Sequence, residues 1–91
     1  MKKRLHASFR GRVQGVGFRF TTERIARHFK VTGCVRNLPN GKVELVAEGE
    51  EQALVDFLKA LREGPMSHYI EDIEIEWSEA LGNFTEFGIG Y

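Results

Sequence analysis

The sequence predicts an α+β fold, because two segments with a helical apolar stripe are interleaved with four or five segments of strand-like alternation. The predicted order is strand, helix, strand, strand, helix, strand, followed by a short extra strand. Each helix has one apolar stripe to bury, so both are expected on one face of a mostly antiparallel sheet of four to five strands. This is the ferredoxin-like βαββαβ sandwich, which supports many functions and therefore selects none.

The first half of the chain is predicted to contain a strand, a glycine-rich connection, a helix and a second strand. Polar and apolar residues alternate over residues 3–13, which is typical of a half-buried strand. Apolar residues then recur at helical spacing, which predicts a helix of about three turns over residues 19–30. Gly33 is expected to begin the exit into the second strand, Cys34–Leu38.

A hairpin and the second helix follow. Pro39-Asn40-Gly41 is a strong turn signal between two strand-like runs, so a hairpin should lead into a strand over Lys42–Glu48 that ends at Gly49. The clearest helical stripe of the chain comes next, and Gly64-Pro65 is expected to end that helix. The apolar members of the stripe are Ala53, Leu54, Phe57, Leu58 and Leu61.

The last third of the chain is predicted to supply the remaining strands. Isoleucine or tryptophan alternates with acidic residues over residues 69–78, which predicts a strand. Gly82-Asn83 marks a turn, and Phe87 and Ile89 indicate a short last strand.

The composition is that of a small folded domain. With 42% hydrophobic and 29% charged residues, one domain over residues 1–91 is expected rather than disorder. The basic start lacks the apolar run of a signal peptide, and no stretch is long enough to span a bilayer, so no membrane association is expected. The one cysteine, Cys34, allows no internal disulfide, which agrees with a reducing cytoplasm. We expect a monomer.

Charge is unevenly spread along the chain, although the formal net charge is zero. Residues 1–36 carry many basic side chains but one acidic side chain, Glu23, and the remainder is strongly acidic. The basic side chains are Lys2, Lys3, Arg4, Arg10, Arg12, Arg19, Arg24, Arg27, Lys30 and Arg36. They could steer a small anion, or they could face the acidic remainder in the fold. We expect the second interpretation to explain most of the asymmetry, with steering as an addition.

The chain is organised around the glycine-rich stretch Gly-Arg-Val-Gln-Gly-Val-Gly-Phe-Arg, residues 11–19. Such a loop can turn several backbone N–H groups and a helix N-terminus toward one anion. Arg19 lies where the helix begins, and its planar guanidinium suits two phosphate oxygens at once. The stretch lacks the Gly-Lys-Ser/Thr ending of nucleotide hydrolases, and Phe20 stands where a dinucleotide fingerprint has its third glycine. The loop alone leaves a phosphate site and a plain strand-to-helix connection both open.

A second motif makes the sequence more specific. The glycine-rich stretch is followed at residues 33–44 by Gly-Cys-Val-Arg-Asn-Leu-Pro-Asn-Gly-Lys-Val-Glu, and the two motifs together resemble the acylphosphatase family over nearly the whole chain. The resemblance implies a small metal-independent hydrolase of carboxyl–phosphate mixed anhydrides. Its implied partner is a small-molecule acyl phosphate, and no cofactor is implied.

The resemblance also implies roles for individual residues. The phosphate-binding arginine of the family falls on Arg19, and its water-orienting asparagine falls on Asn37. The loop whose backbone cradles the phosphate falls on Gln14, Gly15, Val16, Gly17, Phe18 and Arg19. Taken alone, an asparagine beside a hairpin more often satisfies backbone groups of the turn. Asn37 can reach the loop if the first and second strands lie near each other in the sheet.

One departure from the family pattern is visible. Cys34 stands where a large aromatic residue is expected, which bears on packing near the site and on substrate affinity. We expect a buried strand cysteine rather than a nucleophile. His6, His28 and His68 show no metal-ligand spacing, so no metal site is predicted, and His6 is expected to be solvated.

Two alternative functions are open on the same fold. Residues 15–18, Gly-Val-Gly-Phe, faintly match an aromatic RNA-binding motif, but that motif belongs on a central strand with exposed rings, so no nucleic acid is expected. The other alternative is an idle anion-sensing or carbamoyl-phosphate-handling module, because the family includes such a domain fused to larger maturation proteins.

Overall fold

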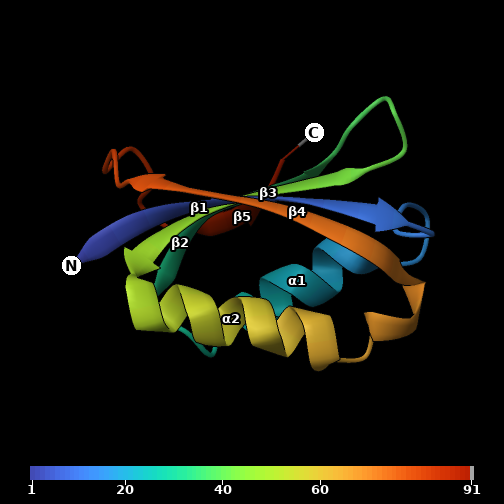
Figure 1. Ribbon diagram of the computed structural model, residues 1–91, viewed down its shortest axis with the longest axis horizontal. Helices are drawn as coiled ribbons and strands as arrows, with labels where there is room; N and C mark the ends of the chain where they lie inside the picture. The colour runs from blue at the N-terminus through green and yellow to red at the C-terminus, as the bar shows by residue number, and fades with distance from the viewer. Residues whose placement is uncertain (91) are drawn as a thin grey trace.

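The structure is a computed structural model that describes residues 1–90, and within that range five strands form one sheet with two α-helices against the same face (Figure 1). The predicted ferredoxin-like α+β sandwich is therefore confirmed. The elements are β1 (Lys2–Gly11), α1 (Phe18–Ala26), β2 (Val31–Asn37), β3 (Val43–Glu50), α2 (Glu51–Glu63), a short 3-10 helix (Ser67–Tyr69), β4 (Ile70–Glu79) and β5 (Phe87–Ile89).

The strands lie in the order β4-β1-β3-β2-β5. β1 is antiparallel to both β3 and β4, and β2 is antiparallel to β3. Only the short edge strand β5 runs parallel to its neighbour, β2, among the described strand pairs. β1 and β2 are thus separated by β3, so the ends of these two strands are one strand apart rather than adjacent.

The core lies between the sheet and the two helices. Alternate residues of β1 and β3 face the helices and are fully buried, and the α2 stripe that the sequence predicts is buried against them. Phe57 of α2 lies at the centre, with its ring centroid 5.8 Å from that of Phe29 and 5.7 Å from that of Phe87. Each such large side chain contributes about 1.5–3 kcal/mol through burial of apolar surface. Neither helix described in residues 1–90 is long and apolar enough to cross a bilayer.

The boundaries around α1 differ from the prediction. The helix begins at Phe18 and ends at Ala26, whereas the sequence predicts residues 19–30. After Ala26 the α-helix gives way to tighter turns, in which the backbone N–H groups of residues 27–29 donate to carbonyls three residues earlier. Phe29 still packs against the core, which explains why its spacing looks helical. β2 then begins at Val31, before the predicted Cys34.

Other boundaries move by smaller amounts. β1 ends at Gly11 rather than residue 13, because its pairing with β4 shifts register between Arg10 and Gly11. Gly49 does not end β3, which runs on to Glu50 and passes directly into α2. β4 lies one residue later than the predicted 69–78. The hairpin at Pro39-Asn40-Gly41 forms as predicted, with Leu38 N–H donating to the Lys42 carbonyl at 2.9 Å.

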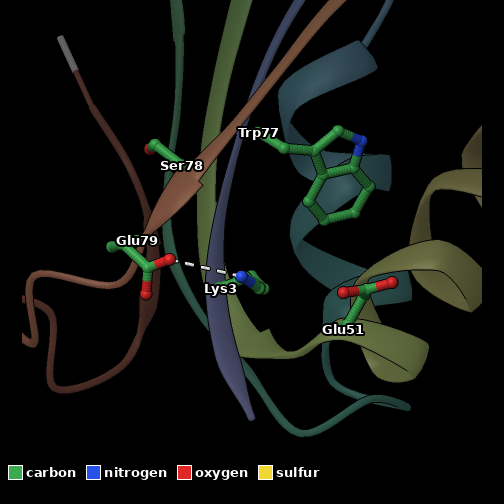
Figure 2. A pocket seen from close by; sticks show the side chains of 5 residues that line it. All are labelled: Lys3, Glu51, Trp77, Ser78 and Glu79. Atoms are coloured by element: carbon green, nitrogen blue, oxygen red, sulfur yellow. Dashed lines mark hydrogen bonds and ion pairs between the residues drawn. The ribbon is translucent and has the colours of Figure 1, made fainter.

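The basic first third and the acidic remainder meet across neighbouring strands. Lys3 Nζ donates to Glu79 at 3.3 Å (Figure 2), and Arg4 Nη1 donates to the buried Glu48 carboxylate at 2.7 Å. These pairs support the interpretation that the charge asymmetry reflects facing segments.

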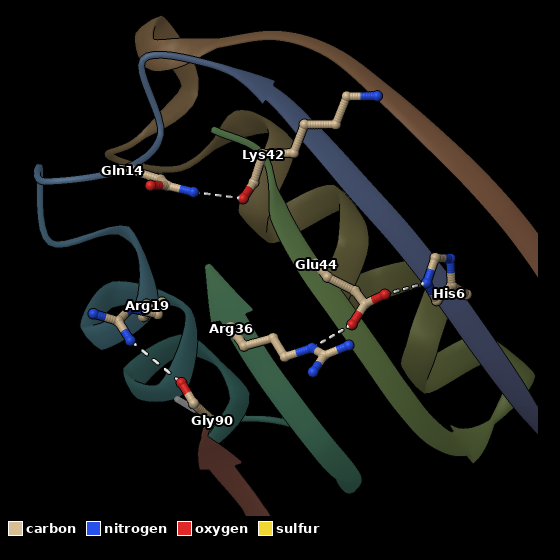
Figure 3. Close-up of polar contacts among 7 residues, drawn as sticks. All are labelled: His6, Gln14, Arg19, Arg36, Lys42, Glu44 and Gly90. Carbon is tan, nitrogen blue, oxygen red and sulfur yellow. Dashed lines mark hydrogen bonds and ion pairs between the residues drawn. The ribbon is translucent and has the colours of Figure 1, made fainter. Parts of the chain in front are cut away.

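His6 also takes part in this pairing, and its side chain remains 39% exposed on the polar face of β1. Its Nε2 lies 2.9 Å from the Glu44 carboxylate, and Arg36 Nε donates to the same carboxylate at 2.6 Å (Figure 3). The pKa of Glu44 is lowered, because the hydrogen bonds from His6 and Arg36 outweigh the opposing effect of its partial burial.

Candidate functional site

The glycine-rich loop, the start of α1 and the end of β2 surround one pocket. Its volume is about 210 Å³. The lining residues are Val13, Gly15, Gly17, Phe18, Arg19, Phe20 and Asn37. Five predicted site residues are thus brought together although they come from two separate motifs, whereas Gln14 and Val16 do not line the pocket.

The loop adopts a conformation that depends on its glycines. Gly15 has φ +76° and Gly17 has φ +80°, which is the left-handed region that side chains with a Cβ rarely adopt. A Cβ at either position would have no neighbour within 4 Å, so backbone conformation rather than space requires glycine here.

The backbone amides of this loop are available to a ligand. Within residues 1–90, the N–H groups of Gln14 through Phe18 make no hydrogen bond. Gly17 is also the N-cap of α1, which has no side-chain cap and no acidic residue in its first turn. Several open donors therefore precede a helix N-terminus, where the helix dipole favours negative charge. The arrangement is suited to an anion.

Gln14 turns away from the pocket and toward the β2–β3 hairpin. Its side-chain Nε2 donates to the carbonyl of Leu38 at 2.7 Å and to the carbonyl of Lys42 at 2.8 Å (Figure 3). One NH₂ group thereby joins the loop to the hairpin, next to Asn37. The sequence places Gln14 in the loop but carries no signal for the direction of its side chain.

Arg19 is the second residue of α1 and is partly buried. Its Nη1 donates to the carbonyl of Gly90 at 3.3 Å (Figure 3), and the Gly90 N–H donates to the Val35 carbonyl at 2.8 Å. The parallel pairing of β5 with β2 therefore brings the last described residue to the guanidinium. The sequence gives no sign of this contact, because the short strand at residues 87–89 has no predictable partner.

Asn37 is the last residue of β2 and lines the pocket with its neighbours from the loop. Its side chain makes no hydrogen bond within residues 1–90. The turn is instead satisfied by Asn40, whose Oδ1 accepts from the Lys42 N–H at 3.0 Å. The structural role that an asparagine beside a hairpin often has therefore falls to Asn40, and Asn37 contributes to the pocket lining instead.

A larger hollow of about 290 Å³ lies elsewhere, where β4 passes the start of α2 (Figure 2). Lys3, Glu51, Trp77, Ser78 and Glu79 line it. Its one lysine is already paired with Glu79, and Glu51 adds a second carboxylate, so it would repel an anion. No group of three or more His, Cys, Asp or Glu side chains that could hold a metal ion occurs in residues 1–90. Of these two hollows, the smaller one is the better candidate for an anion site.

Cys34 lies outside this pocket. It is half-buried on β2, where we expected a buried side chain, and it borders a separate surface hollow with Arg36, Glu44, Val46 and Phe84. Residues alternate between faces along a strand, so Cys34 lies on the sheet face opposite the helices. The departure from the family pattern therefore does not alter the lining of the pocket.

Phe18 does not match the RNA-binding alternative. It is 2% exposed, and its ring centroid lies 5.1 Å from that of Phe9 in the core. A ring in this position has no face on which a base could stack.

Known proteins resemble this chain over nearly its full length. The acylphosphatase family model matches residues 5–89. An acylphosphatase of Salinibacter ruber is 46% identical over 88 residues, covering 97% of this chain and 93% of that protein. The crystal structure of acylphosphatase from Bacillus subtilis has a TM-score of 0.89 and 39% identity, and the alignment covers 98% of this chain and 99% of that one.

A longer protein also contains a similar domain. The crystal structure of T. kodakarensis HypF matches with a TM-score of 0.83 and 32% identity, and the alignment covers 98% of this chain but 12% of that one. The family match, the identities and the shared fold together show that this chain belongs to the acylphosphatase family.

Proposed function

We propose that this enzyme hydrolyses the carboxyl–phosphate bond of small acyl phosphates in the loop–Asn37 pocket. Residues 14–19 of the glycine-rich loop bind the phosphoryl group through their backbone N–H groups and the Arg19 side chain, and Asn37 orients the attacking water. Acylphosphatase activity follows from family membership, and the observation that supports this site for it is the convergence of Gly15, Gly17, Arg19 and Asn37 on one pocket.

The phosphoryl group carries most of the charge to be stabilised. The amides of Gln14 through Phe18 and the guanidinium of Arg19 are N–H donors, and phosphate oxygens are acceptors. Phosphoryl transfer through a loose transition state needs mainly positioning and charge stabilisation, which such donors supply. By analogy with oxyanion holes, each donor is worth about 10²–10³ in rate.

Water is the nucleophile in this proposal. The carboxamide of Asn37 can accept a hydrogen bond from the water through its oxygen and donate to a phosphate oxygen through its NH₂ group. The water oxygen forms a bond to phosphorus, and the bond between phosphorus and the acyl oxygen breaks with its electron pair going to the carboxylate. The products are a carboxylate, inorganic phosphate and a proton. A carboxylate leaves without protonation, which suits a pocket in whose lining residues 1–90 place no acidic or histidine side chain.

The experiment is phosphate release from benzoyl phosphate by the parent enzyme and by Arg19→Ala, Arg19→Lys and Asn37→Ala. Each variant should lose about 10²–10³ in kcat/KM while keeping the parent unfolding temperature. Arg19→Lys should also fail, because an ammonium cannot present two parallel donors. Arg24→Ala, at an exposed basic residue in the last turn of the same helix, is the matched control. Unchanged turnover in an Arg19 or Asn37 variant would overturn the assignment.

The proposal extends to metal dependence, oligomeric state and cellular location. We expect metal-independent turnover by a monomer in a reducing cytoplasm, without a nucleic acid partner. Light scattering of the active enzyme tests the expected monomer. Turnover should be insensitive to chelator, and chelator-sensitive activity would contradict the metal-free mechanism.

A further inference from the structure

Phe20 is a large aromatic side chain that the fold leaves exposed at the candidate site. It follows Arg19 on α1, is 64% exposed, and lines the same pocket as Gly15, Gly17 and Asn37. The other large hydrophobic side chains that are exposed in residues 1–90 are Met1, Val55, Trp77 and Leu81, and none of them lines this pocket. Phe20 therefore contributes little to the core and is available to a ligand.

The residues that line the pocket differ in chemistry. Gly15 and Gly17 present backbone N–H groups, and Arg19 and Asn37 present polar side chains. The apolar residues Val13 and Phe18 are 1% and 2% exposed, so almost all of their surface is already packed. Phe20 is thus the lining side chain with a large apolar surface to offer.

An acyl phosphate bound at this pocket likewise has a charged phosphoryl part and an acyl part. Its phosphoryl end requires the N–H donors, so its acyl end extends away from them. An aromatic acyl group that covers the Phe20 ring would remove apolar surface of both partners from water, and paired rings gain further from their geometry. An acetyl group is too small to cover much of the ring.

We propose, on the basis of the function assigned above, that Phe20 is an acyl-binding residue that makes aromatic acyl phosphates the preferred substrate class. Contacts to the phosphoryl group contribute equally to the affinity for all acyl phosphates, and contact with the Phe20 ring makes the affinity differ between acyl groups. Phe20 is a specificity residue, and the chemical step does not need it.

The test compares benzoyl phosphate with acetyl phosphate in the parent enzyme, Phe20→Leu and Phe20→Ala. Phe20→Ala should lower kcat/KM for benzoyl phosphate by about three- to tenfold, mainly through KM, and lower the value for acetyl phosphate by a much smaller factor. Phe20→Leu should lie between the parent and Phe20→Ala. Leu81→Ala is the matched control, because Leu81 is 66% exposed and lies outside the pocket. An equal effect of Phe20→Ala on both substrates, or no effect on either, would overturn the inference.

A binding measurement separates this inference from the proposed reaction. Phenylphosphonate and methylphosphonate are stable anions that differ in their apolar group, and calorimetry gives their affinities without turnover. The parent should bind phenylphosphonate more tightly, and Phe20→Ala should remove that advantage by the same three- to tenfold factor. Arg19→Ala should weaken both ligands together. If the parent shows no preference, the inference fails even where hydrolysis is measured; if it hydrolyses neither acyl phosphate, the proposed function fails even where the preference is seen.

Discussion

The side-chain amide of Gln14 donates to the carbonyl of Leu38 at 2.7 Å, and so binds the glycine-rich loop to the residue that follows Asn37. The same Nε2 also donates to the carbonyl of Lys42 at 2.8 Å. The two motifs of the sequence are therefore held together by a side chain rather than by adjacent strands, since β3 separates β1 from β2.

We predict that Gln14→Ala lowers kcat for acyl phosphate hydrolysis, because the loop amides and Asn37 lose their shared support. Two carbonyls each lose one donor but keep another, from the Gly41 N–H at Leu38 and from the Leu38 N–H at Lys42, so the change should cost about 0.5–1.5 kcal/mol per lost bond in the free energy of unfolding. Gln14→Glu should also lower kcat and stability, because a carboxylate offers no donor to these carbonyls. Denaturant titration and steady-state kinetics measure the two effects. Gln52→Ala, at an exposed glutamine that pairs with Asp56, is the control. A Gln14→Ala enzyme with the parent kcat would show that the contact only stabilises the fold.

A second prediction concerns the loop glycines. Gly15→Ala and Gly17→Ala should each destabilise the protein by about 1–2 kcal/mol, because alanine resists the left-handed conformation. Both should also lose activity, since relief of this strain redirects the loop N–H groups to which we assign phosphate binding.

The hairpin offers a matched control for these variants. Gly41 has φ +90° and, like Gly15 and Gly17, no neighbour within 4 Å of an added Cβ. Gly41→Ala should therefore show a similar loss of stability while keeping kcat/KM. Equal activities of the Gly15, Gly17 and Gly41 variants would argue against a backbone role in phosphate binding.

A third prediction is acid sensitivity from Glu44. Its pKa lies below 4.5, first because His6 hydrogen-bonds to it and then because Arg36 does, against the opposing effect of burial. A depressed pKa in the folded state stabilises the protein above pH 4.5, and this stabilisation is lost as the pH falls through the lowered value.

The variant that tests this is Glu44→Gln. It should lose about 1 kcal/mol of stability at neutral pH and show a weaker decline in stability below pH 4.5 than the parent. Unfolding free energies across this pH range measure both effects. Glu71→Gln, whose partner Arg10 is largely exposed, should change neither, because surface ion pairs contribute little. Parallel pH profiles of the parent and Glu44→Gln would contradict the prediction.

The sequence predicts most of the fold because its apolar pattern is regular. Alternate residues of β1 and β3, and the stripe of α2, are buried as the pattern indicates. The boundaries near Ala26 were wrong for a physical reason: Phe29 packs into the core from a turn, so its spacing matches a helix that has already ended. Spacing reports which side chains are buried, and backbone hydrogen bonds decide where the helix stops.

The candidate site was predictable only in part. Arg19 and Asn37 stand in motifs that can be recognised along the chain, and both line the pocket. The contact of Gln14 with Leu38 spans 24 residues and that of Arg19 with Gly90 spans 71, so both depend on how distant segments pack. The spacing of residues along one segment carries no information about such contacts. The pairing of His6 with Glu44 was missed for the same reason, because Glu44 lies on another strand.

The contact between Arg19 and Gly90 has a practical consequence for labelled or tagged protein. A fusion partner attached after residue 91 would start two residues beyond the Gly90 carbonyl to which Arg19 donates, so its bulk and charge would be tethered close to that guanidinium. An N-terminal attachment would start at the far end of β1, whose length of 10 residues corresponds to about 30 Å from the glycine-rich loop. Affinity handles, fluorophores and surface linkers for quantitative work on this enzyme therefore belong ahead of Met1.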